Sequence, residues 1–173
     1  RQLRFELRAS PSQSVSDLSL NRIVGEELDF ENERPGDGAS FAAGATLRAG
    51  DHLAVRLDAE RRWLDVRPDS SGPRQRLFTA SVERVKAIWT FNARSFLRLI
   101  GQWDRTVRDP LLYEFPVPAE EGAFAASALF SYKLNWQSVL FLGYGDDRAL
   151  GPEGDLVKAG REFFLKVSYA FQR

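Results

Sequence analysis

Cysteine and methionine are both absent from this chain of 173 residues, and histidine occurs once. The lack of cysteine suits an exported protein without disulfides, and it suits many cytosolic proteins equally well. Lysine plus arginine and aspartate plus glutamate both number 24, so no net field argues for a nucleic-acid partner or an acidic tail. Partners must therefore be argued from individual surfaces.

Long apolar runs are also missing. Charged residues make up 28% of the chain and the mean hydropathy is −0.34. The longest apolar stretches, such as Phe124–Phe130, are far shorter than the roughly 20 residues that a transmembrane helix needs. This excludes a helical membrane protein. It does not exclude a membrane barrel, whose charged residues lie in the lumen and the loops.

The last segment, residues 162–173, alternates strictly between apolar and mixed positions. One side of the expected strand carries Phe163, Leu165, Val167, Tyr169 and Phe171. A half-buried strand of a soluble protein also alternates, but it seldom places Phe and Tyr repeatedly on its apolar side. Strands of outer-membrane barrels do so because they contact lipid and carry aromatic residues near the membrane surfaces.

The same alternation recurs along the whole chain and predicts an all-β, antiparallel fold of about nine strands in one segment, residues 1–173. The pattern is clearest between His52 and Trp63. Near Arg84 and Val85 the alternation slips, which predicts a bulge there. The strands are expected at residues 2–9, 15–30, 39–48, 52–66, 76–90, 94–107, 123–134, 136–145 and 161–172.

The predicted connections alternate in length. Those after strands one, three, five and seven are short, whereas the others, including residues 31–38, 68–73, 109–121 and 146–160, are longer and rich in Gly, Pro and charge. Outer-membrane barrels have short periplasmic turns and long external loops. We therefore expect the first and the last strand both to run toward the periplasm.

An odd number of strands is unusual for a closed antiparallel ring, which normally has an even number. Either the count is wrong by one, or the chain is the C-terminal arc of a larger transmembrane barrel. We favour the arc, because no initiator Met or signal peptide precedes Arg1, so that a processed or excised piece is expected. The strand at residues 2–9 then needs a partner from missing N-terminal strands or another chain, since open edges in lipid are costly.

The segments Phe96–Trp103, Leu129–Tyr132, Val139–Asp146 and Phe163–Phe171 together resemble the C-terminal end of an uncharacterised family of Gram-negative outer-membrane proteins. The resemblance covers mainly residues 76–173. It implies a location in the bacterial outer membrane, with lipid and lipopolysaccharide as surroundings. In that family a domain similar to carbohydrate-binding modules precedes the barrel. No such domain is present in these residues, so no sugar-binding residue is implied.

The closing strand is also similar to the signal that the outer-membrane insertion machinery reads, an aromatic terminal residue preceded by alternating apolar ones. The machinery is therefore an expected partner during assembly. The chain departs from that signal because Gln172 and Arg173 follow Phe171.

Charged residues that alternate with the apolar positions are candidates for a lumen-facing set. Neighbouring opposite charges can form cross-strand ladders that only stabilise the sheet, which is the interpretation we favour. They can also line a polar channel and tune permeation. The candidates are Arg4, Glu6, Arg8, Arg56, Asp58, Glu60, Arg62, Arg98, Asp104, Lys133 and Lys166.

Aromatic residues near the predicted strand ends suit the interfaces between membrane and water, where indole and phenol rings combine an apolar body with a polar group. They could equally be core residues of a soluble sandwich. The candidates for such interfacial belts are Trp63, Trp89, Trp103, Trp136, Tyr144, Tyr169 and Phe171.

No recognisable catalytic or metal-binding constellation is present. His52 could serve as a general acid or base, but it follows a tight turn at Gly50 without a serine nucleophile pattern, which favours a solvated turn histidine. Gly143–Gly145 is too short for a phosphate loop. The acidic segments 26–33 and 146–155 could bind calcium or bridge lipopolysaccharide through divalent ions, yet neither has a regular ligand loop, and solvated loops are favoured.

These observations predict an outer-membrane β-barrel protein with a structural or porin-like, passive-transport role. They predict no enzyme, no cofactor, no metal and no nucleic-acid partner. The alternative is a soluble β-sandwich or a lipocalin-like binding domain, in which the same alternation faces a closed core. Dependence on detergent distinguishes the two.

Overall fold

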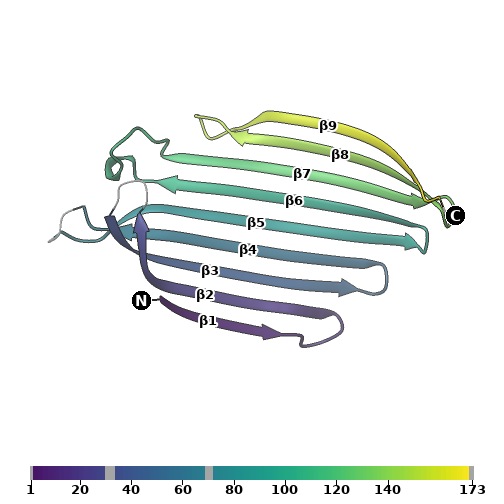
Figure 1. The fold of residues 1–173 in the computed structure, drawn as a ribbon, viewed down its shortest axis with the longest axis horizontal. Coiled ribbons are helices and arrows are strands. Elements are labelled where there is room, and N and C mark those ends of the chain that lie inside the picture. The colour runs from purple at the N-terminus through teal and green to yellow at the C-terminus, as the bar shows by residue number, and fades with distance from the viewer. Residues whose placement is uncertain (1, 30–33, 69–71, 172–173) are drawn as a thin grey trace.

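The computed structural model describes residues 2–29, 34–68 and 72–171. They form one antiparallel sheet of nine strands, each paired with its neighbours in sequence (Figure 1). The predicted all-β, nine-stranded fold is thereby confirmed. The elements are β1 (Gln2–Ala9), β2 (Val15–Asp29), β3 (Arg34–Ala49), β4 (Leu53–Val66), β5 (Gln75–Asn92), β6 (Ser95–Arg108), the short 3-10 helix η1 (Pro110–Leu112), β7 (Glu120–Lys133), β8 (Ser138–Leu150) and β9 (Leu156–Tyr169).

The register of the strands converts the alternation of the sequence into two continuous faces. Residues directly opposite each other in antiparallel strands point to the same face. Leu7 of β1 lies opposite Leu20, which lies opposite Ala43, which lies opposite Ala59 of β4. A slip of one residue would turn a whole strand over, so the apolar positions keep the nine strands in phase.

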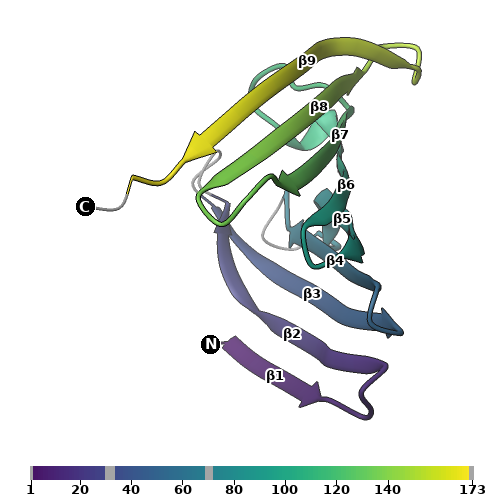
Figure 2. The same cartoon turned by 90° about the vertical axis from the view of Figure 1, so that its right-hand side faces the viewer.

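The sheet is curved and open. Figure 2 shows β1 and β9 at opposite edges of the arc, and among the described residues neither strand pairs with a second neighbour. Every residue of β1 is exposed. Because each strand is antiparallel to the next, β1 and β9 run in the same direction. The sheet that the structure describes is therefore an arc, not a closed ring.

The two ends of the sheet differ. We call the end at which β1, β3, β5 and β7 finish the turn end, and the end at which β2, β4, β6 and β8 finish the loop end. In the middle of the sheet the predicted length alternation is clear: residues 50–52 and 93–94 connect strands at the turn end, and residues 67–74 and 109–119 at the loop end. The first turn-end connection, residues 10–14, is longer than the other two named.

Several predicted loops are strand instead. β3 already begins at Arg34, β8 continues to Leu150 and β9 starts at Leu156, so the predicted loop 146–160 shrinks to residues 151–155. The charged residues there suggested a loop. In the structure they form ion pairs within and between strands. Trp136, expected in a strand, lies in the β7–β8 connection. The predicted strand ends at residues 30 and 172, and parts of the loops around 30–33 and 69–71, lie outside the described residues.

The predicted bulge at Arg84 is wrong. Arg84 lies opposite both Asp58 and Gln102 in an unbroken register. The register shifts instead lie elsewhere, between Ser16 and Ser19, between Leu64 and Asp65, between Thr90 and Asn92, and between Asp147 and Arg148.

A small apolar cluster lies at the loop end. Leu64, Val66 and Leu77 of β4 and β5 pack with Leu112 of η1, and Phe78 and Tyr113 lie against them. The carboxylate of Asp109 accepts a hydrogen bond from the Leu111 amide (3.1 Å), and proline follows it at the first helical position. The β6–β7 connection is thus folded back onto the sheet.

Candidate functional site

One face of the sheet is hollowed. The hollow crosses β1 to β6 and is lined by charged and polar side chains of alternate positions, among them Glu6, Arg56, Asp58, Glu60 and Arg84. We call this face, on the inside of the curve in Figure 2, the concave face, and the opposite one the convex face.

All the charged residues that the sequence suggested for a lumen lie on the concave face. Glu6 lies opposite Asn21, Asn21 opposite Ala42, and Ala42 opposite Glu60. The same reasoning through the register places the rest, from Arg4 and Arg8 on β1 to Lys166, which lies opposite Phe141 of β8.

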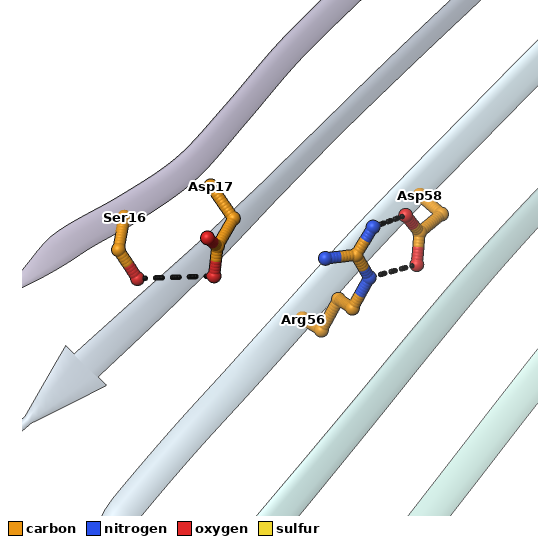
Figure 3. Close-up of polar contacts among 4 residues, drawn as sticks. All are labelled: Ser16, Asp17, Arg56 and Asp58. Atoms are coloured by element: carbon orange, nitrogen blue, oxygen red, sulfur yellow. Dashed lines mark hydrogen bonds and ion pairs between the residues drawn. The ribbon is translucent and has the colours of Figure 1, made fainter. Parts of the chain in front are cut away.

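Ion pairs on this face run partly within strands and partly across them. Arg56 donates two hydrogen bonds to Asp58 in the same strand, Nε to Oδ2 at 2.9 Å and Nη2 to Oδ1 at 2.7 Å (Figure 3). Glu6 pairs with Arg8, again within one strand, at 2.6 Å. The cross-strand ladder that the sequence suggested is therefore only partly built.

Glycine lets a longer-range pair lie flat on the sheet. Arg62 of β4 bonds to Glu27 of β2 across the intervening β3. At Gly38 of β3, an added Cβ would lie 2.0 Å from Oε2 of Glu27. A side chain at this position would push the Glu27 carboxylate aside, so this geometry of the pair depends on the glycine.

The β6–β7 connection is anchored to the concave face by a hydrogen bond from an arginine that is itself held in an ion pair. Arg34 Nε lies 2.9 Å from Oδ2 of Asp29, whose side chain is 3% exposed, and the same guanidinium donates to the backbone carbonyl of Leu112. This contact was not predicted from the sequence. Its only sequence signal is the cap formed by Asp109 and Pro110, which predicts a local turn but not where the turn packs.

The convex face is apolar over its turn-end half. Phe163, Leu165 and Val167 of β9 are 71%, 62% and 63% exposed. The register continues this surface across every strand to β1. Further exposed apolar residues of the convex face as a whole include Leu3, Phe5, Leu7, Phe41, Leu47, Leu57, Val85, Trp89, Leu99, Tyr144 and Tyr169.

The loop-end half of the convex face carries ion pairs instead. Arg105 pairs with Glu120 at 2.8 Å, and Asp146 accepts from Arg148 at 2.9 Å and from Arg161 at 3.1 Å. Further toward the loop end, Arg74 pairs with Asp37 and Arg76 with Asp65. On the convex face, most strands therefore change from apolar residues near the turn end to charged residues near the loop end.

Asp146 was expected in an acidic loop that could hold calcium. It lies in β8 and is bonded to two arginines, so the solvated loop that was predicted here is wrong for this residue. Among the described residues no group of three or more His, Cys, Asp or Glu is arranged to hold a metal ion.

The candidate belt aromatics fall into two groups. Trp63, Trp103 and Tyr144 lie on the convex face where its apolar half meets the charged half. The others lie toward the turn end: Trp89 near the end of β5, Trp136 in the β7–β8 connection, Tyr169 at the end of β9 and Phe171 beyond it. The rings of Tyr169 and Phe171 meet edge to face at 4.7 Å between centroids.

His52 lies in the turn between β3 and β4. Its Nδ1 is 2.7 Å from the carbonyl oxygen of Thr90, and the His52 carbonyl accepts from the Thr90 amide at 2.7 Å. The side chain therefore ties the turn to the end of β5.

Comparisons with known proteins found no match to this chain among protein-family models, curated proteins or solved structures. Within the described ranges, no helix is long and apolar enough to cross a membrane.

Proposed function

We propose that this chain is part of the wall of an outer-membrane-type transmembrane β-barrel with a structural or passive-transport role. One observation carries the proposal: a wide, exposed apolar surface on the convex face, backed by a charged concave face. Soluble monomers rarely expose a contiguous apolar patch larger than a few hundred Å². Lipid outside and water inside would satisfy both faces.

The position of the apolar surface suggests how the barrel sits in the membrane. The strands from β2 onward have 13 to 18 residues, more than the roughly 9–11 that a tilted transmembrane strand needs. Lipid would cover the turn-end half, and the ion-paired loop-end half would project beyond it. The two groups of aromatic residues would then mark the two membrane interfaces.

The directions of the two edge strands limit how many further strands could close the ring. β1 and β9 run in the same direction, so an all-antiparallel ring needs an odd number of additional strands between them. They would come from N-terminal strands outside these residues or from another chain. Unpaired edge groups in lipid cost several kcal/mol each, which is why completion is required for a membrane location.

The resemblance of residues 76–173 to the Gram-negative family points the same way. The proposed location is the bacterial outer membrane, with lipopolysaccharide around the loop end and the insertion machinery as a transient partner during assembly. A soluble β-sandwich or lipocalin-like domain would instead need a second layer of chain over the convex face.

Cysteine labelling in membranes tests the proposal, since these 173 residues contain no cysteine. Neighbouring residues provide matched pairs: Leu57→Cys and Leu165→Cys on the convex face, Asp58→Cys and Lys166→Cys on the concave face. We expect a charged maleimide to label only the concave positions and a lipid-soluble maleimide to label the convex ones. Equal labelling of both faces, in a protein that stays monodisperse without detergent, would favour the soluble alternative.

A further inference from the structure

The two halves of the concave face carry opposite charge. Counted from the midpoint of each strand, the loop-end half has seven acids against four arginines, Arg4, Arg34, Arg62 and Arg108. The acids are Glu27, Asp29, Glu60, Asp104, Glu121, Asp147 and Glu162. The turn-end half has only Glu6, Asp17 and Asp58 as acids. Its cations are Arg8, Arg48, Arg56, Arg84, Lys86, Arg98, Lys133 and Lys166.

Part of this cationic half is also apolar. Arg98 lies opposite Ile88 on one side and Leu129 on the other. Lys86 lies opposite Ile100, and Lys166 lies opposite Phe141. We call Lys86, Arg98, Lys133 and Lys166, with Ile88, Ile100, Leu129 and Phe141, the cationic patch.

The cations of this patch lack carboxylate partners among the described residues. The nearest acid along β4, Asp58, is held by both hydrogen bonds of Arg56. Arg56 itself lies directly opposite Lys86, and like charges in that position repel. Lys86 and Arg98 are moreover half-buried. Charged groups partly removed from water without a counter-ion are destabilising, so a bound anion would stabilise this surface.

We propose that the cationic patch binds amphipathic organic anions, with a carboxylate head and an aliphatic or aromatic tail. The head would be held between Lys86 and Arg98, because an ammonium and a guanidinium form strong charge-assisted hydrogen bonds to a carboxylate. The tail would lie on Ile100, Leu129 and Phe141. The inference deepens the proposed function, on which it rests for placing this face toward a water-filled lumen.

Decanoate is a suitable probe for binding to the complete native protein in nanodiscs of zwitterionic lipid, with empty nanodiscs subtracted. Decanoate is expected to bind, while acetate, which lacks the tail, and decanol, which lacks the charge, bind at least tenfold more weakly. Lys86→Gln and Arg98→Gln are each expected to weaken decanoate binding about tenfold. Phe141→Ser is expected to weaken decanoate binding without changing that of acetate.

Arg61→Gln is the matched control, because it removes the same charge from the convex face, and it is expected to leave binding unchanged. Circular dichroism of each variant checks that the sheet is intact. If decanol binds as well as decanoate, or Arg61→Gln weakens binding as much as Arg98→Gln, the inference is overturned.

The labelling experiment separates this inference from the proposed function. A protein that labels as a barrel but does not bind decanoate overturns the ligand site alone. A protein that labels equally on both faces yet binds decanoate through Lys86 and Arg98 retains the ligand site, and the membrane location is then wrong.

Discussion

The convex and the concave face are built from alternate residues of the same strands, yet they have opposite chemistry. Leu57 and Leu99 of the convex face are 40% and 45% exposed, while their immediate neighbours in sequence, Arg56, Asp58 and Arg98, occupy the concave face. In the proposed barrel, the convex face would meet lipid and the concave face water. A two-faced sheet without a packed core is stable only where each face finds its own surroundings.

The largest expected effect comes from placing a charge on the convex face. Leu99→Arg should destabilise the barrel by about 2–4 kcal/mol, the range for a cation at the lipid midplane. Ser127→Arg, on the concave face of the adjacent strand, should change stability by less than about 0.5 kcal/mol. Denaturant unfolding in lipid vesicles measures both. Equal, small effects would mean that the convex face contacts water.

The folded-back connection offers a second contrast, between adjacent leucines. Leu112 is 7% exposed and packs in the loop-end cluster, whereas Leu111 is 92% exposed. Leu112→Ala should cost about 2–3 kcal/mol of local stability, at the low end for a buried leucine. Amide exchange of residues 109–119 should accelerate accordingly. Leu111→Ala should leave the exchange unchanged, and acceleration by both would show that the connection is not anchored through Leu112.

Alanine substitutions at two strand glycines, one on each face, should give a third and smaller contrast in stability. A Cβ at Gly143, on the concave face, would lie 1.9 Å from Cε1 of Phe164, while a Cβ at Gly101, on the convex face, would meet nothing within 4 Å. Gly143→Ala should therefore destabilise by about 1–2 kcal/mol through overpacking. Gly101→Ala should be nearly neutral. Combining Gly143→Ala with Phe164→Ala should remove most of the clash, and thermal unfolding would show whether it does.

The smallest effect is expected for an exposed ion pair on the loop-end half of the convex face. A double-mutant cycle of Arg105→Gln and Glu120→Gln should give a coupling of about 0.2–1 kcal/mol that falls in high salt. A coupling well above that range, insensitive to salt, would place this pair in lipid and move the proposed membrane boundary toward the loop end.

Much of the fold was predictable because strand periodicity is local. The alternation of Leu53, Val55 and Leu57 with Arg56 and Asp58 identifies both the strand and its two faces without any knowledge of its neighbours. Strand ends were predicted less well where charge and glycine suggested loops. Gly36 and Asp146 lie in strands because each is accommodated by a neighbouring strand that the local sequence does not show.

The candidate site was also predictable only in part. The charged concave residues were found from periodicity alone. The anchor formed by Arg34 and Asp29 on Leu112, and the pair of Arg62 with Glu27 across Gly38, were not found. Each joins residues from different strands, and their proximity depends on register and curvature.

The sequence by itself determined the antiparallel strands, the two opposed faces and the residues on each, since these follow from a period of two along one strand. Only the tertiary structure decided that the sheet is an open arc with parallel edges, that cations gather at the turn end of its concave face, and that the β6–β7 connection folds onto it. Those features arise between strands, where the register of one chain segment against another sets which side chains meet.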